Sequence, residues 1–317
     1  MLGVTVMLAI AGPGVMRNDP LAVDLDASFW PPSARFWLGS DELGRDLLTR
    51  CVYGVRLSLV AAIVVTNTAV GAGLIIGGVA GYVGGRVDNV LMRITDMFLA
   101  FPALVLALAI AAALGPSLNN AVLAVAVVWW PWYARLIRGQ VLGVKATAYI
   151  EASFATGATP SRIILRHMLP NCIAPVLVMA SMDLGNVILA TAGLSFIGLG
   201  AKPPTPELGA MISQGRRYLL DYWWIPTTPG LVILFMALGM NLMGDAFRDL
   251  LDPSAPRPVD DERSNRPTSP TSERDPLMRE ADIKKSAVEH MWMHATQMRD
   301  VATDIGRGSL SKGTVVA

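Results

Sequence analysis

The sequence predicts an all-α integral membrane protein with about six transmembrane helices. The composition is 53% hydrophobic and only 16% charged, and the mean hydropathy over 317 residues is +0.46. Several apolar segments also reach the roughly 17 to 25 residues that a spanning helix needs. Such a chain carries more apolar surface than one soluble core buries. A membrane helix bundle is therefore expected rather than a soluble domain.

Five apolar segments approach or exceed the length of a membrane span. They are residues 57–83, 94–114, 118–134, 172–199 and 225–243. A sixth segment, residues 1–16, is short and carries Gly12, Pro13 and Gly14. It lacks the basic start and the small-residue cleavage site of a secretory signal. We interpret it as a first span, which gives six helices with both chain ends on the same side.

Composition divides the chain into three parts. Residues 1–56 hold the first span and a polar segment, residues 57–252 hold the other five spans, and residues 253–317 are rich in Pro, Ser, Arg and Asp. Low hydrophobicity predicts a mostly disordered tail. His290 and His294 are spaced for a shared metal on a helix face. The segment is not HExxH, however, and no metal site is expected.

Charge and cysteine content narrow the function further. A formal net charge of +1 provides no clustered basic face for nucleic acid. Cys51 and Cys172 are too few for a disulfide framework, and in the predicted topology they face opposite sides of the membrane. Both are expected to be small buried hydrophobic side chains. Basic residues are spread over the loops of both sides, so the positive-inside rule does not decide the orientation.

One face of the segment 57–83 is predicted to pack closely against a neighbouring helix. Gly73, Gly77, Gly81 and Gly85 recur at every fourth position. This spacing places them on one helix face, where the missing side chains let another backbone approach. We interpret the glycines as helix packing rather than as the lining of a pore.

A polar segment, EASFATGATPSRIILRHMLP (residues 151–170), lies between two apolar ones. Gly157 supplies the left-handed position that commonly ends a helix, and Thr159 before Pro160 is a typical N-cap and first-turn pair. The pattern predicts a helix, a sharp turn and a second helix that stops near Pro170. We call residues 145–172 the elbow. It is expected either to dock on a soluble partner or to pack on its own bundle.

The elbow resembles the EAA motif of permease subunits of binding-protein-dependent ABC importers. The motif has a glutamate followed by alanines, a glycine six residues later and a closing Leu-Pro. The matching residues are Glu151, Ala152, Gly157, Leu169 and Pro170. The sequence departs from the motif at Ser153, where a second alanine is expected, and at His167, where an isoleucine is expected.

Four further blocks are similar to the C-type permease of dipeptide and oligopeptide importers. They are residues 38–59, 96–108, 192–220 and 243–253. Together with the elbow they make five blocks, in the order found in that family, spread over residues 20–253. The resemblance implies a type I ABC importer bundle in the inner (cytoplasmic) membrane, with a cytoplasmic elbow and both termini cytoplasmic.

The resemblance also implies partners. A homologous second permease would complete a heterodimer in the lipid bilayer, one or two P-loop ATPase subunits would dock on the elbow, and an extracytoplasmic substrate-binding protein would deliver cargo. ATP and Mg are expected on the ATPase subunits, because this chain has no G-x-x-x-x-G-K-[ST] phosphate loop. No cofactor and no catalytic residue are expected here. The residues implied in coupling to the ATPase are Glu151, Ala152, Ser153, Gly157, Arg162, His167, Leu169 and Pro170.

Asp183 is a charged residue about ten residues into the fifth predicted span, where a charge costs about 2.5 to 3.5 kcal/mol on insertion scales. One hypothesis is that it lines the pathway and meets a peptide amino terminus. The alternative is a structural hydrogen bond to Ser181, to Asn186 or to a neighbouring helix.

The predicted function is the permease subunit of an ATP-driven importer that moves dipeptides or oligopeptides by alternating access. Nickel or another small solute is the alternative cargo. An ion-coupled secondary transporter is a weaker alternative, because such proteins usually carry several intramembrane ionisable groups and inverted repeats. An intramembrane enzyme would need a catalytic constellation that the predicted spans lack.

Overall fold

A computed structural model describes residues 7, 11–12, 14–16, 18–155 and 159–251. Most of the predicted first span and the whole tail 253–317 lie outside these residues. The elements of the described part are helical. In chain order they are η1 (Leu25–Ala27), α2 (Leu47–Val83), α3 (Gly85–Leu99), α4 (Ala103–Leu114), α5 (Leu118–Lys145), α6 (Ala148–Ala155), α7 (Pro160–Ile163), the π-helical η2 (Ile164–Met168), α8 (Leu169–Ile197), α9 (Leu208–Gly215), η3 (Arg216–Tyr218) and α10 (Trp224–Leu251).

Four helices in the described part are long and apolar enough to cross a membrane. They are α2, α5, α8 and the Trp224–Ala246 part of α10, and the bent pair α3 and α4 makes a fifth if it counts as one span. α2 begins at Leu47 rather than at residue 57. The Asp46 carboxylate caps this earlier start, because it accepts hydrogen bonds from the amides of Leu48 and Thr49. The helix therefore passes through the charged residues that interrupt the hydropathy signal.

The predicted span 94–114 is not one continuous helix, because the chain breaks in its middle. α3 ends at Leu99, α4 begins at Ala103, and the two helices are bent by 86°. Pro102 has no N–H to continue the helical hydrogen bonds and disfavours the helical conformation at Phe101. The proline lies at the N-cap of α4, with an extended backbone (ψ 121°). A hydropathy average does not register this change of direction.

The elbow also differs from its prediction at the end of its second helix. α7, η2 and α8 follow one another without a gap, so the chain does not stop near Pro170. Pro170 lies in the first turn of α8, a position that tolerates the missing N–H. The π-helical residues of η2 shift the hydrogen-bond register just before it. The elbow is thus continuous with a membrane-spanning helix.

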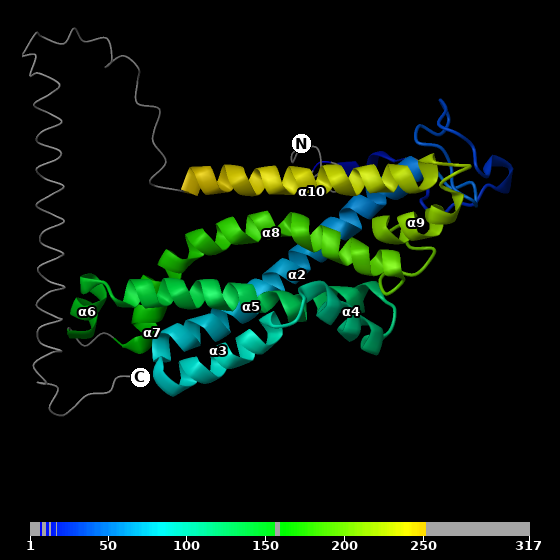
Figure 1. Cartoon of the computed structure of the whole chain (residues 1–317). Helices are drawn as coiled ribbons and strands as arrows, with labels where there is room; N and C mark the ends of the chain where they lie inside the picture. The colour runs from blue at the N-terminus through cyan, green and yellow to red at the C-terminus, as the bar shows by residue number, and fades with distance from the viewer. Residues whose placement is uncertain (1–6, 8–10, 13, 17, 156–158, 252–317) are drawn as a thin grey trace, which may run out of the picture. The chain divides into compact units, whose positions relative to one another are not determined.

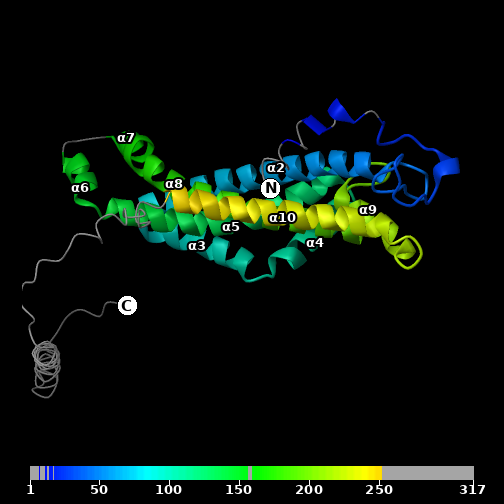
Figure 2. The same cartoon turned by 90° about the horizontal axis from the view of Figure 1, so that it is seen from above.

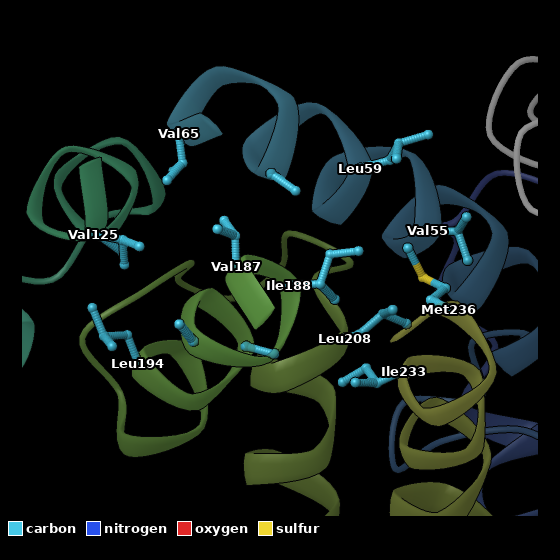
Figure 3. Close-up of a cluster of buried hydrophobic side chains, with 14 of the residues drawn as sticks. Val55, Leu59, Val65, Val125, Val187, Ile188, Leu194, Leu208, Ile233 and Met236 are labelled. Atoms are coloured by element: carbon cyan, nitrogen blue, oxygen red, sulfur yellow. The ribbon is translucent and has the colours of Figure 1, made fainter. Parts of the chain in front are cut away.

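The long helices pack around two buried apolar clusters. One joins α2, α4, α5, α8, α9 and α10, and Figure 3 shows Val65, Val125 and Val187 of this cluster converging from three helices. The other joins α5 to the elbow and to the start of α8. Figure 1 shows α6 and α7 at one end of the helices and α9 at the other. We call these the elbow end and the cap end, the cap being residues 18–46 together with residues 200–223.

Candidate functional site: the elbow and the helices that carry it

The elbow is attached to the bundle by buried apolar side chains. Ile150 of α6 and Ile163 of α7 are completely buried, and Met168 of η2 is 2% exposed. They join Ile137 and Val141 of α5 in one cluster. Burial of a side chain of this size is worth about 1.5 to 3 kcal/mol. One face of the elbow therefore packs on its own bundle and follows α5 and α8.

The other face of the elbow is open and basic. Arg162, Arg166 and Pro170 are exposed. Asn171 of α8 is joined to Tyr149 of α6, because its side-chain amide donates a hydrogen bond of 3.0 Å to the tyrosine hydroxyl. An anchored inner face and a cationic outer face suit a surface that docks a partner while remaining coupled to the membrane helices.

The predicted coupling residues lie on four consecutive elements of the elbow. Ser153 is on α6, Arg162 on α7, and Leu169 with Pro170 starts α8. Glu151 and Ala152 belong to the α6 backbone and His167 to the η2 backbone. Their side chains, and all of Gly157, lie outside the described part of the structure. The role of Glu151 and Arg162 in coupling to the ATPase therefore stays a prediction.

The glycine-bearing face of α2 lies directly against α5. A side chain at Gly73 would meet Tyr133, at Gly77 it would meet the backbone of Ala134, and at Gly81 it would lie 2.9 Å from Val141. Gly85 lies outside this face. It has φ of 58° after the break at Gly84, and an added Cβ there would meet no atom within 4 Å. Its place is in the turn that starts α3.

Asp183 forms a hydrogen bond between two spans. The Tyr133 hydroxyl of α5 donates to the Asp183 carboxylate of α8 at 2.9 Å, and the Asn186 side-chain amide lies 3.4 Å from it. The Ser181 hydroxyl instead donates to the Val178 carbonyl. The sequence predicted a partner on a neighbouring helix without identifying Tyr133, because the two residues are 50 positions apart in the chain. A buried tyrosine hydroxyl nevertheless usually finds a partner, which was the available signal.

A second set of functional candidates, missed from the sequence, lies between α3 and α5. The Arg138 guanidinium holds both carboxylate oxygens of Asp88, at 2.5 and 2.7 Å. Arg135 pairs with Asp96 at 2.6 Å. The members of the Asp88–Arg138 pair are 50 positions apart in the chain, so nothing local in the sequence indicated the contact.

The cap end holds buried charges instead. Arg45 and Asp41 pair at 2.7 Å with side chains only 4% exposed. Arg50, 1% exposed, donates hydrogen bonds to the carbonyls of Pro20 and Pro204 and so ties the two segments of the cap to α2. Glu207 caps α9 by accepting from two backbone amides. Burial raises the pKa of this carboxyl, and the amide hydrogen bonds offset only part of the rise.

The two cysteines are free and buried. Cys51 lies near the start of α2 and Cys172 near the start of α8. These helices start at opposite ends of the bundle (Figure 1). Within the described residues no group of three or more His, Cys, Asp or Glu side chains is arranged to hold a metal.

Residues 73–256 match the family model of the binding-protein-dependent transport system inner membrane component. The chain belongs to this family. Its members are membrane transport subunits, and the predicted multi-pass helical bundle and the family resemblance are confirmed.

Curated relatives agree with the family over most of their length. The chain is 48% identical over 249 residues to the "Probable D,D-dipeptide transport system permease protein DdpC" of Escherichia coli strain K12, which covers 78% of this chain and 84% of the relative. It is 43% identical to the "Di/tripeptide transport system permease protein DppC" of Pseudomonas aeruginosa strain UCBPP-PA14 (78% and 84% covered). It is 38% identical to the "Nickel transport system permease protein NikC" of Escherichia coli strain K12 (78% and 89% covered).

A solved structure shares the fold of this permease family member. A chain of the inward-facing MetNI methionine ABC transporter superposes with a TM-score of 0.53 at 22% identity, and the match covers 65% of this chain and 98% of that one. At this identity the likeness concerns the fold alone. The matched part of the chain thus has the fold of that transporter chain.

Proposed function

We propose that this chain is the permease subunit of an ATP-driven importer that moves dipeptides or other short peptides across the cytoplasmic membrane. The observation that carries the proposal is its 48% identity to a permease named for D,D-dipeptide transport, over 84% of that relative. The nickel permease is also similar, at 38%. Nickel is therefore the second candidate cargo.

The elbow is the docking surface for the ATPase in this proposal. Its exposed arginines and its buried attachment to α5 support that role. The ATPase subunits carry ATP and Mg, a second homologous permease completes the pathway as a heterodimer, and a substrate-binding protein meets the cap. The elbow end and both chain termini then lie in the cytoplasm.

Transport follows from the way the elbow is built. Closure of the ATPases on ATP moves the elbow, and its apolar cluster with α5 carries α5 along. Because α7 and η2 continue into α8, the same movement reaches a second span. Rigid-body shifts of this kind interconvert inward-open and outward-open states. The residues that couple the elbow to the ATPase in this account are Glu151, Ala152, Ser153, Gly157, Arg162, His167, Leu169 and Pro170.

Asp183 has two proposed roles, and the hydrogen bond from Tyr133 supports the structural one. In that role Asp183→Asn, which keeps an oxygen acceptor, leaves the preference for a free peptide amino terminus unchanged. In the pathway role the same variant loses the preference. Competition between a dipeptide and its N-acetylated form in uptake assays separates the two.

Co-purification of partners tests the assembly. The chain is captured from its own cells in mild detergent, and the captured proteins are identified by mass spectrometry. A second permease, P-loop ATPases and a binding protein with affinity for dipeptides are expected. A binding protein that takes Ni²⁺ and no peptide would move the cargo to nickel. Recovery of the folded chain alone, in every preparation, would contradict the importer and favour a secondary transporter.

A further inference from the structure

α3 is joined to its neighbours by two turns that permit movement. Its N-cap is Gly84 and its first residue is Gly85, and their φ angles of 70° and 58° lie in the region that favours glycine. It ends before Pro102, where the chain bends by 86° into α4. A rigid helix between two such breaks can change its direction without unfolding.

The apolar attachment of α3 to the rest of the chain is thin. Of its 15 residues only Asp88 and Thr95 are buried. The Thr95 hydroxyl donates its hydrogen bond to the Leu91 carbonyl of the same helix. The ring of Phe98 meets Trp130 of α5 edge-on at 5.4 Å. Core packing alone therefore does not fix the position of α3.

Ion pairs along α5 supply the attachment instead. We call the Asp88–Arg138 and Asp96–Arg135 pairs the ladder. The first is bidentate, and the side chain of Asp88 is only 12% exposed, which makes it the stronger of the two. The second is half exposed on both sides. Figure 1 and Figure 2 both show α3 alongside the part of α5 near the elbow.

A third polar contact continues the ladder to the elbow itself. Lys145, the last residue of α5, donates a hydrogen bond of 2.8 Å to the Tyr82 carbonyl at the end of α2. Lys145, Arg138 and Arg135 thus meet Tyr82, Asp88 and Asp96 in antiparallel order. The polar contacts begin where the elbow begins and extend toward the bend.

We propose that Asp88, Asp96, Arg135 and Arg138 are positioning residues for transport, which make α3 follow α5 when the elbow moves. The proposal rests on the proposed importer function. Movement at the ATPase then reaches the bent pair α3 and α4 through polar contacts between helices. Without the ladder, α5 moves and α3 is left behind, so ATP is hydrolysed without completing the change of access.

The number of ATP molecules hydrolysed per dipeptide imported tests the ladder. The complete importer is reconstituted in vesicles, and import by the wild-type complex shows first that the proposed function holds. Asp88→Asn and Arg138→Gln are each expected to raise the ratio about 3- to 30-fold. The exchange Asp88→Arg with Arg138→Asp is expected to restore most of it. Arg93→Gln, which removes an exposed charge from α3 outside the ladder, leaves the ratio unchanged.

A merely structural role predicts a different result. ATP hydrolysis and import would then fall in the same proportion, together with the amount of assembled complex, and the ratio would not move. That result would overturn the proposal, as would an exchange variant as poorly coupled as the single variants.

A cross-link provides a second test on the exposed pair, whose substitution is expected to cost little stability. Asp96→Cys and Arg135→Cys are combined in a chain whose Cys51 and Cys172 are replaced by alanine. The variant is expected to be poorly coupled, and a short bis-maleimide linker between the two new thiols is expected to restore the wild-type ratio. Loss of import on linking would show that α3 must separate from α5, and it would contradict the proposal.

Discussion

Each end of the bundle has its own ion pairs, and the two sets of charged side chains lie in different environments. At the cap end, Asp41, Arg45 and Arg50 have side chains that are 1% to 4% exposed. At the elbow end, Asp96 and Arg135 are more than half exposed, while the other pair joins Arg138, 34% exposed, to Asp88, 12% exposed. Buried pairs are costly to open, whereas exposed pairs contribute little and exchange readily with water. The cap is therefore expected to be fixed and the elbow end to be movable.

Removing a buried partner at the cap should give the largest effect. Asp41→Ala leaves Arg45 and Arg50 without their common carboxylate, and an uncompensated buried charge costs about 3 to 5 kcal/mol. Thermal unfolding in detergent should show a strongly lowered midpoint. Arg35→Ala is the control, because its pair with Asp24 is exposed. Equal midpoints for the two variants would mean that the cap is not held by its buried charges.

Loss of the elbow's apolar anchor should have the second-largest effect. Ile163 is completely buried, and Ile163→Ala is expected to cost about 2 to 5 kcal/mol and to weaken ATPase binding in a pull-down. Arg162→Ala, one position away and exposed, should leave the unfolding midpoint unchanged while it weakens ATPase binding. If Ile163→Ala kept both properties, the elbow would not be carried by α5.

Adding a single methyl group where α2 packs closely against α5 should lower the stability of the protein. At Gly77 an added Cβ collides with the Ala134 backbone, and overpacking of this kind costs about 1 to 3 kcal/mol. Gly78→Ala is a matched control, since a Cβ there meets nothing within 4 Å and alanine favours the helix. Unfolding midpoints should fall for Gly77→Ala and not for Gly78→Ala. A reversed order would place the close face elsewhere.

The exposed pair of the ladder should matter least for stability. Asp96→Asn removes a pair with both side chains half exposed, which is worth about 0 to 1 kcal/mol. The unfolding midpoint should hardly change, even though coupling does. A fall as large as that of Asp41→Ala would remove the contrast between the two ends.

Much of the fold could be predicted from the sequence, because hydropathy and glycine spacing are local signals. The spans within α2, α5, α8 and α10 follow from apolar runs, and Gly73, Gly77 and Gly81 lie against α5 at the spacing that predicted a close face. The bend at Pro102 was visible as a proline, yet the apolar residues on both sides concealed it. The first source of error was therefore a proline that bends the chain within a run of apolar residues.

The candidate site was less predictable, because its contacts join distant residues. The EAA-like residues marked the elbow, whereas the pairing of Asp88 with Arg138 and of Tyr133 with Asp183 depends on how α3, α5 and α8 are placed. The continuation of α7 into α8 was missed because Pro170 is a usual stop signal. In the first turn of a helix it is not one.

Import of a labelled dipeptide into vesicles that contain the reconstituted complex tests the central claim most directly. The account predicts uptake that requires the binding protein and ATP, is competed by unlabelled dipeptide and is unaffected by Ni²⁺. Uptake that persists without ATP and follows an ion gradient, or uptake of Ni²⁺ with no uptake of peptide, would contradict it.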